Sequence, residues 1–409
     1  MKKLIPKRRF EKFKDSEAWE QRKLGDEVVF YSGLTYSPSN VIDSGGTLVL
    51  RSSNVKDGEI VEADNVYVSS DVVNSDNVQI GDVIVVVRNG SRSLIGKHAQ
   101  IKETMKNTVI GAFMTGARYQ QSAFLNVLLS TPQFYNEIEK NMGATINQIT
   151  TGAFKEMKFY FPDIGEQKRI GDFFLNLDNL ITLHQRKLKK LRNLKSAYLS
   201  EMFPKDGELY PKRRFAGFTD PWEQRKLGEL AQYRRGSFPQ PYGRDGWYDG
   251  DGAMPFVQVV DVTDQLELAE KTKQKISKLA QPMSIFVTKG SVIVTLQGSI
   301  GRVAITQYDC FVDRTLLIFE RYNKPINEVF WAYTIQMKFD IEKEKAPGGT
   351  IKTITKEALT NFIVLLPSLE EQQKIGNFFN NLDNLITLHQ RKLEKLEGLK
   401  QAYLSEMFI

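Results

Sequence analysis

Apolar side chains recur every three or four residues through one long stretch of the chain, residues 166–203. This spacing is that of one face of an α-helix, and no proline interrupts it. The pattern predicts a single helix of 38 residues, about 57 Å long. The apolar positions are Ile170, Phe173, Phe174, Leu177, Leu180, Ile181, Leu188, Leu191, Leu194, Tyr198 and Met202. The opposite face is basic, so this helix needs a partner to cover its apolar stripe.

The same segment occurs a second time, at residues 371–408, after a constant offset of 205. Eight of the 38 aligned pairs differ, so 30 are identical. The offset is half the length of the 409-residue chain, which is therefore two halves with the same helical ending. The simplest partner for each helix is its own repeat.

We expect the two helices to pack antiparallel about a pseudo-two-fold axis, with parallel packing or separate docking as alternatives. The residues predicted to form the helix pair or a partner surface are Ile170, Phe174, Leu177, Ile181, His184, Leu188, Tyr198, Ile375, Phe379, Leu382, Ile386, His389, Leu393 and Tyr403. His184 and His389 interrupt the two stripes near their midpoints. They suit a polar pair that fixes helix register, or else a metal-binding or pH-sensing pair.

The beginnings of the two halves also match, whereas their middles differ. Residues 6–10 (PKRRF) return as 211–215, and residues 19–25 (WEQRKLG) return as 222–228. The blocks between the shared ends, residues 26–142 and 229–347, have little in common beyond turns. A common scaffold that presents two different surfaces is the organisation this predicts.

Within each block, a β-branched strand runs into a Gly-Ser turn followed by basic residues. Residues 81–91 correspond to residues 290–299. Backbone amides, a hydroxyl and a basic side chain suit a phosphate contact, although a plain surface hairpin explains the same residues. The candidates for DNA contact around these two turns are Arg88, Ser91, Arg92, Lys97, Ser299 and Arg302.

Other loops add candidates for contacts with base edges. The first block has a strand that we expect to end at Asn54, and the corresponding strand of the second block ends at Asp261. Gly33 and Gly236 open matching loops, of which the second is rich in arginine and aromatic residues. Arginine binds guanine edges, although solvated loop arginines are the commoner case. The candidates here are Arg51, Asn54, Arg234, Arg235, Arg244 and Gln258.

Composition narrows the class of protein. A net charge of +7 and a pI near 9.1 fit a polyanionic partner, although many soluble proteins are equally basic. One cysteine, Cys310, excludes a disulfide framework and fits a reducing cytosol. No apolar run is long enough for a signal peptide or a membrane span, so we expect neither. The sequence has no phosphate-binding loop or dinucleotide fingerprint, and a Ser/His/Asp site is improbable with only three scattered histidines. We expect no catalytic residues and no metal site.

The junctions before the helices, Pro-x-x-x-Glu-Gln-x-x-Ile at Pro162 and Pro367, carry a family resemblance. Together with the LDNLITLHQRKL helices, the PKRRF and WEQRKLG segments and the Gly-x-Thr turns at Gly143 and Gly348, they make the chain similar to specificity subunits of type I restriction–modification enzymes. The resemblance spans the whole two-fold layout.

Several properties are implied by this resemblance. The fold would be mixed α/β: target-recognition domains at residues 1–165 and 205–370, and spacer helices at 166–204 and 371–409. The chain would be a non-catalytic subunit in the bacterial cytoplasm that reads a bipartite duplex-DNA target, one half-site per domain. It would carry two methyltransferase subunits and the restriction/translocase subunits, with S-adenosylmethionine, ATP and Mg²⁺ bound by those partners rather than by this chain. Asp178, Asp383, Arg186, Arg391, Tyr198 and Tyr403 would form the partner surface or the helix pair.

Two other classes of protein remain open from the residues alone. A coiled-coil adaptor would bind proteins through its two blocks and would have no affinity for duplex DNA. A single-chain nuclease or methyltransferase would need a catalytic motif, and the sequence has none.

Overall fold

The computed structural model describes residues 5–56, 58–143, 147–345 and 356–409. The chain forms two compact units, residues 1–186 with 391–409 and residues 187–390. Each unit contains part of both long helices and has a hydrophobic core of its own. The predicted Gly-x-Thr turns at Gly143 and Gly348 include residues that lie outside the described ranges.

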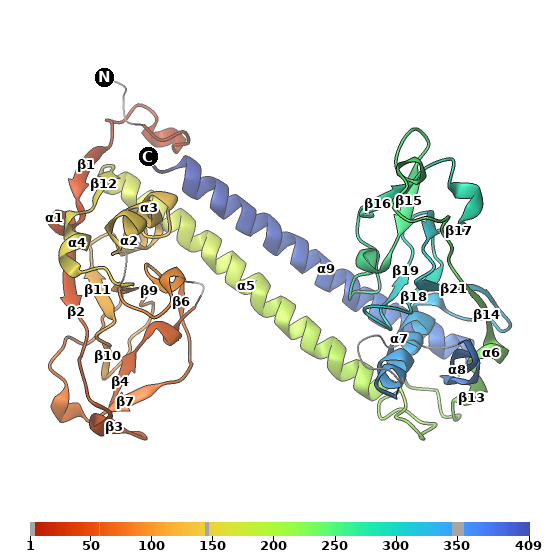
Figure 1. The fold of residues 1–409 in the computed structure, drawn as a ribbon. Helices are drawn as coiled ribbons and strands as arrows, with labels where there is room; N and C mark the ends of the chain where they lie inside the picture. Colours follow the sequence, from red (N-terminus) through yellow and green to blue (C-terminus); the bar gives the residue numbers. More distant parts are fainter. Residues whose placement is uncertain (1–4, 57, 144–146, 346–355) are drawn as a thin grey trace. The chain divides into compact units, whose positions relative to one another are not determined.

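The two repeated segments are the helices α5 (Ile164–Met202) and α9 (Leu369–Glu406). In the first unit, the beginning of α5 packs against the end of α9, and Phe174 and Phe408 share one core. In the second unit, the end of α5 packs against the beginning of α9, and Phe203 and Phe379 share another. The helices therefore run antiparallel in each unit, as predicted (Figure 1).

The first unit contains an antiparallel sheet in the order β2-β11-β8-β9 and a second sheet in the order β10-β4-β7-β3, in which β10 and β4 are parallel. Two small antiparallel pairs, β1-β12 and β5-β6, complete it. The strands are β1 (Glu20–Lys23), β2 (Val29–Ser32), β3 (Val41–Ile42), β4 (Thr47–Leu50), β5 (Val55–Lys56), β6 (Glu59–Ile60), β7 (Val66–Val68), β8 (Val83–Val86), β9 (His98–Gln100), β10 (Thr108–Ile110), β11 (Met114–Arg118) and β12 (Lys158–Phe161). The shorter helices are α1 (Leu24–Glu27), α2 (Ser122–Leu128), α3 (Pro132–Asn141) and α4 (Thr151–Glu156).

The second unit repeats this topology. Its antiparallel sheet has the order β14-β21-β18-β19, and its other sheet, β16-β15-β20-β17, also contains one parallel pair, β15 with β20. The strands are β13 (Glu223–Lys226), β14 (Ala231–Arg235), β15 (Met254–Val257), β16 (Gln274–Ile276), β17 (Ile285–Val287), β18 (Val292–Thr295), β19 (Val303–Ile305), β20 (Cys310–Val312), β21 (Leu316–Tyr322) and β22 (Ile363–Leu366). The shorter helices are α6 (Leu227–Leu230), α7 (Glu328–Lys345) and α8 (Lys356–Asn361). The divergent blocks therefore share one mixed α/β fold, and they differ in the fourth strand: β3 lies beside β7, whereas β17 lies beside β20.

Buried ion pairs explain the Glu-Gln junctions at the start of both long helices. The Arg9 guanidinium binds the Glu166 carboxylate at 2.7 Å, and Arg214 binds Glu371 in the same way at 2.7 Å. In the first pair the side chains are 4% and 1% exposed. The hydrogen bond to Glu166 raises the pKa of Arg9, so the guanidinium stays charged. The PKRRF segment thus anchors the beginning of the helix in its own half.

The adjacent arginine of each segment binds the end of the other helix of the pair. In the first unit, Arg8 forms an ion pair with Glu406 of α9 at 2.5 Å. In the second, Arg213 binds Glu201 of α5 at 2.6 Å. Each N-terminal segment therefore lies beside the long helix that ends the opposite half.

Gly171 of α5 provides a test of how closely that helix packs within the first unit. A Cβ at this position would lie 2.8 Å from the backbone nitrogen of Phe124 and 2.9 Å from the Cβ of Ala123. We expect Gly171→Ala to lower the free energy of unfolding by about 1–3 kcal/mol, although alanine favours the helix. The matched control is Gly398→Ala in α9, where nothing lies within 4 Å, and it should raise stability by up to about 1 kcal/mol. Urea denaturation measures both, and equal stabilisation by the two substitutions would contradict the close contact.

Candidate nucleic-acid interface

The strand β4 ends earlier than predicted, and this changes the interpretation of Asn54. The chain leaves β4 at Leu50 and enters a 3₁₀ turn, Ser52–Asn54. Asn54 is 1% exposed, and its side-chain Oδ1 accepts a 2.9 Å hydrogen bond from the Arg51 backbone N–H. The side chain of Asn54 therefore holds the turn, and its contact with DNA stays a prediction. Arg51 itself is partly exposed and forms a 2.7 Å ion pair with Asp64.

The second unit has the same turn after β15, which also ends before the predicted residue. Asp261 is 2% exposed and accepts 2.8 Å and 2.7 Å hydrogen bonds from the backbone N–H groups of Gln258 and Lys273. Gln258 is half-buried at the first position of this turn. Sequence position alone cannot separate a polar residue that ends a strand from one that caps a turn, which is why both strand ends were misplaced.

The candidates after β8 divide into exposed and ion-paired residues. Arg88 is exposed, and its guanidinium lies 5.0 Å from the ring centre of Phe113. Ser91 is exposed and hydrogen-bonds Ser93, and Lys97 is half-buried. Arg92 instead binds Glu139 of α3 at 2.6 Å, so a phosphate contact there would have to compete with a carboxylate.

The corresponding turn of the second unit has the same division. Ser299 is exposed at the tip, whereas Arg302 binds Asp264 at 2.9 Å. In both units a buried strand, β8 or β18, runs into this turn, as predicted. The acidic partners of the two arginines are distant in sequence, and the turn motif gave no sign of them.

The loop after β14 presents arginines on an aromatic base. Arg234 and Arg235 are exposed at the end of the strand, and Arg244 lies 4.5 Å above the ring of the buried Trp247. Phe238 stacks on Tyr242 and on Tyr248, with ring centres 5.1 and 5.3 Å apart. The aromatic residues therefore hold the loop in place, and the three arginines are exposed, with Arg234 lying 3.8 Å from the Glu320 carboxylate.

The predicted helix-pair residues are largely buried in their own units. Those less than 9% exposed are Ile170, Phe174, Leu177, Leu188, Ile375, Phe379, Leu382, Ile386 and Leu393. Those partly exposed are Ile181, His184, Tyr198, His389 and Tyr403. His184 and His389 belong to different units, so their proposed pairing stays a prediction. Leu180 and Leu194, expected in the stripe, are 47% and 39% exposed, because the buried seam is narrower than the apolar stripe.

Polar residues of the helix pair form equivalent contacts in the two units. Asp178 binds Lys400 and Asp383 binds Lys195, both at 2.6 Å. Tyr403 packs edge-on against Phe173, as Tyr198 does against Phe378. The aspartates and tyrosines thus stabilise the contact between α5 and α9 within each unit. The matching Arg186 and Arg391 are exposed.

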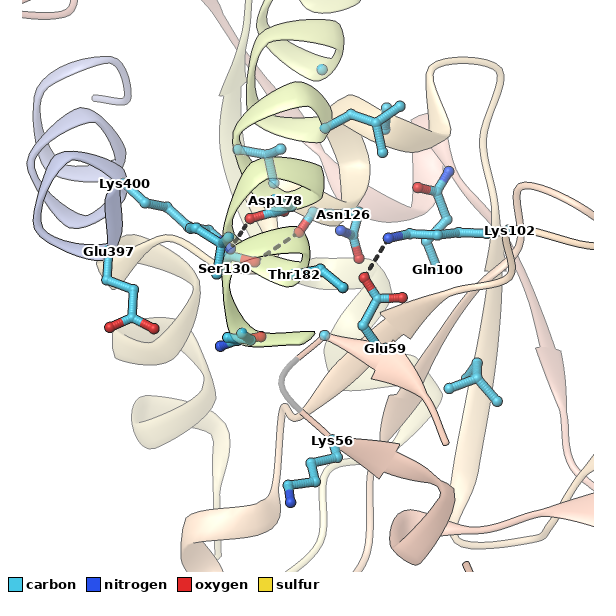
Figure 2. A pocket seen from close by; sticks show the side chains of 18 of the residues that line it. Lys56, Glu59, Gln100, Lys102, Asn126, Ser130, Asp178, Thr182, Glu397 and Lys400 are labelled. Carbon is cyan, nitrogen blue, oxygen red and sulfur yellow. Dashed lines mark hydrogen bonds and ion pairs between the residues drawn. The ribbon is translucent and has the colours of Figure 1, made fainter. Parts of the chain in front are cut away.

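A polar cleft of about 610 Å³ lies in the first unit between the β5-β6 hairpin, α2 and the two long helices. Figure 2 shows two ion pairs at its walls: Lys102 with Glu59 at 2.5 Å and Lys400 with Asp178 at 2.6 Å. Lys56 from the hairpin and Glu397 from α9 also line it. Lys102 and Lys400 are neutralised by carboxylates within the cleft. They are therefore less available to a polyanion than the exposed residues of the loops.

The family comparison decides what this scaffold is. A family model described as the type I restriction modification DNA specificity domain matches the chain twice, at residues 16–193 and 219–398. The chain belongs to this specificity family. Members are DNA-recognition subunits without catalysis of their own.

Relatives of this specificity subunit extend along its whole length. A Methanocaldococcus jannaschii protein, provisionally named as the MjaX specificity subunit, is 23% identical and covers 95% of this chain and 92% of its own. The StySPI specificity subunit of Salmonella potsdam is 20% identical over 96% of this chain and 89% of its own. The type I S subunit of M. genitalium has the same fold, with a TM-score of 0.68 at 14% identity and 99% coverage of both chains.

The buried His98 is held by hydrogen bonds within the first unit. The ring nitrogens of His98 lie 2.9 Å from the Gly96 carbonyl and 2.9 Å from the Ser130 hydroxyl, and burial lowers the pKa of the imidazole. Across the described ranges, no group of three or more His, Cys, Asp or Glu side chains is arranged to hold a metal ion. None of the helices described is long and apolar enough to span a membrane.

Proposed function

We propose that this specificity subunit reads one split target in duplex DNA, with one half-site for each recognition domain. The observation that carries the proposal is a shared backbone frame with different exposed loops. The antiparallel four-stranded sheets of the two units have the same strand order, yet one unit presents Arg88 beside Phe113 and the other presents Arg234, Arg235 and Arg244. A frame that stays constant while its exposed residues differ suits two different DNA sequences.

We further propose that the long helices carry two methyltransferase subunits on equivalent seats. Leucines at matched positions are exposed in both units. In the first unit they are Leu180, Leu183 and Leu399, which are 47%, 45% and 37% exposed. In the second they are Leu385, Leu388 and Leu194, which are 46%, 46% and 39% exposed. Exposed apolar residues repeated in this way favour two copies of one partner.

In this proposal, the complex that the chain forms also includes the restriction/translocase subunits. A solved structure with a TM-score of 0.50 at 19% identity, covering 95% of this chain and 97% of its own, comes from work on complex assembly of the type I restriction–modification system. S-adenosylmethionine, ATP and Mg²⁺ would be bound by the partner subunits, and the complex would act in the bacterial cytoplasm. The pseudo-symmetric helices would keep the two half-sites at a fixed spacing along the groove.

Binding of the purified complex to duplex DNA tests this function. Binding that neutralises six to ten phosphates should weaken about a thousandfold or more between 50 and 200 mM salt, because counterions are released. Specific duplex should also survive competition from unrelated duplex. A complex that assembles but binds no DNA, or binds it with no salt dependence, would contradict the proposal and favour a protein adaptor.

A further inference from the structure

Two turns occupy the same place in the two recognition domains. One joins β10 to β11 through residues 111–113, and the other joins β20 to β21 through residues 313–315. The carbonyl of Phe113 accepts a 3.0 Å hydrogen bond from the backbone N–H of Val87, and the carbonyl of Thr315 accepts one of 2.8 Å from that of Leu296. The backbone frame of the turn is thus common to both domains.

The loop that follows β2 or β14 presses against this turn in each domain. A Cβ on Gly33 would lie 2.0 Å from the carbonyl oxygen of Gly111, and a Cβ on Gly236 would lie 2.4 Å from that of Asp313. No side chain fits at either glycine, so both positions require this residue for close approach. The turn and the neighbouring loop form one rigid edge in each domain.

The side chains at the tips of the two turns are unrelated. In the first domain, the tip carries Phe113, which is 52% exposed and lies under the Arg88 guanidinium. The adjoining cleft of about 700 Å³ is lined in part by Tyr36 and Arg51. A large exposed aromatic at a rigid edge, beside two arginines, has no role in the core of the domain.

In the second domain, the tip carries an arginine in place of the aromatic. Arg314 is exposed, and its guanidinium lies 4.9 Å from the ring centre of Tyr242. The Tyr242 hydroxyl donates a hydrogen bond to the buried Asp313, which also accepts a 2.9 Å hydrogen bond from the Thr315 backbone N–H. The tyrosine is therefore fixed by the turn, and it restricts the arginine above it, so less side-chain entropy is lost on binding.

We propose that these turns are the sequence-reading points of the two domains, with Phe113 and Arg88 contacting bases of one half-site and Arg314 contacting bases of the other. This inference rests on the proposed function. Arginine can bind the O6 and N7 atoms of guanine with two hydrogen bonds, and an aromatic edge packs on the methyl group of thymine. The shared frame explains how each reading point differs in chemistry while the fold around it is unchanged.

Selection of bound sequences from a random duplex pool, using the complete complex, tests the inference. Phe113→Ala should relax base preference at one or two positions of a single half-site, and Arg314→Ala should do so only in the other. At each affected position, discrimination against the wrong base should fall by about 5- to 150-fold. Both side chains are exposed, so thermal melting of each variant should match that of the unaltered chain.

Exposed residues of the same kind supply the controls. Tyr135→Ala on α3, where the side chain is 42% exposed, and Arg321→Ala on β21, which is also exposed, should leave both half-sites unchanged. If the unaltered complex selects a bipartite sequence and both tip variants select the same one, the inference is overturned and the proposed function stands. If a tip variant instead loses its partner subunits, the turn is a protein contact and the inference is likewise overturned. If the unaltered complex selects no sequence, the proposed function fails and the inference fails with it.

Discussion

Replacing Arg9 with methionine should lower the free energy of unfolding of the first unit by about 3–5 kcal/mol, because Glu166 is left buried without its charge partner. The carboxylate is 1% exposed, and its other hydrogen bond is a weak one, 3.3 Å from the Trp19 indole nitrogen. This is the largest loss of stability that we expect from a single polar substitution in the chain. Urea denaturation of the variant, followed by near-ultraviolet circular dichroism, measures it.

A neighbouring arginine and a double substitution provide the controls. Arg8→Met breaks the exposed pair with Glu406, whose side chains are 54% and 36% exposed, and should lower stability far less than Arg9→Met does. Arg9→Met combined with Glu166→Leu removes both charges, so it should recover most of the lost stability. If the single Arg9 variant were as stable as the Arg8 variant, the buried pair would not anchor the beginning of the helix.

Shortening both long helices together should change which DNA sites are methylated. Removal of residues 184–190 and 389–395, the same heptad in each repeat, shortens each helix by about 10 Å and nearly preserves the phase of the apolar stripe. Sites with the original half-site spacing should lose methylation, and any methylation that remains should fall on sites shorter by up to about three base pairs. Methylation mapping in a host that expresses the variant with its methyltransferase subunit measures this.

The repeat itself supplies a control of unchanged length. Lys189 of the first helix corresponds to Glu394 of the second, so Lys189→Glu alters charge in the deleted heptad without shortening it. This variant should keep the original spacing. If the double deletion also keeps the original spacing while it methylates DNA efficiently, the helices do not set the distance between half-sites.

The sequence predicted the long helices, their antiparallel packing and the junction at which each begins. These features depend on periodicity and on repeated motifs, both of which are local. The match between the two middle blocks was predicted only at a few strands and turns, because most of their common frame consists of backbone hydrogen bonds such as those from Val87 and Leu296. Side-chain identity does not record such bonds.

The candidate DNA-contact residues were harder to predict, for a different reason. Arg92 and Arg302 look like free cations in the sequence, yet each binds an acid 47 or 38 positions away, Glu139 and Asp264. Phe113 was missed because a single phenylalanine in a short turn is ordinarily a core residue. Only its 52% exposure and its contact with Arg88 set it apart.

The central claim is that one chain with two recognition domains directs methylation to one split sequence. The most direct test is to sequence the methylome of a host that expresses this chain together with its methyltransferase subunit. We predict a single bipartite motif with methyladenine on both strands, absent from a host that expresses the methyltransferase subunit alone. An assembled complex that methylates no DNA, or methylates a continuous motif read by one domain, would contradict it.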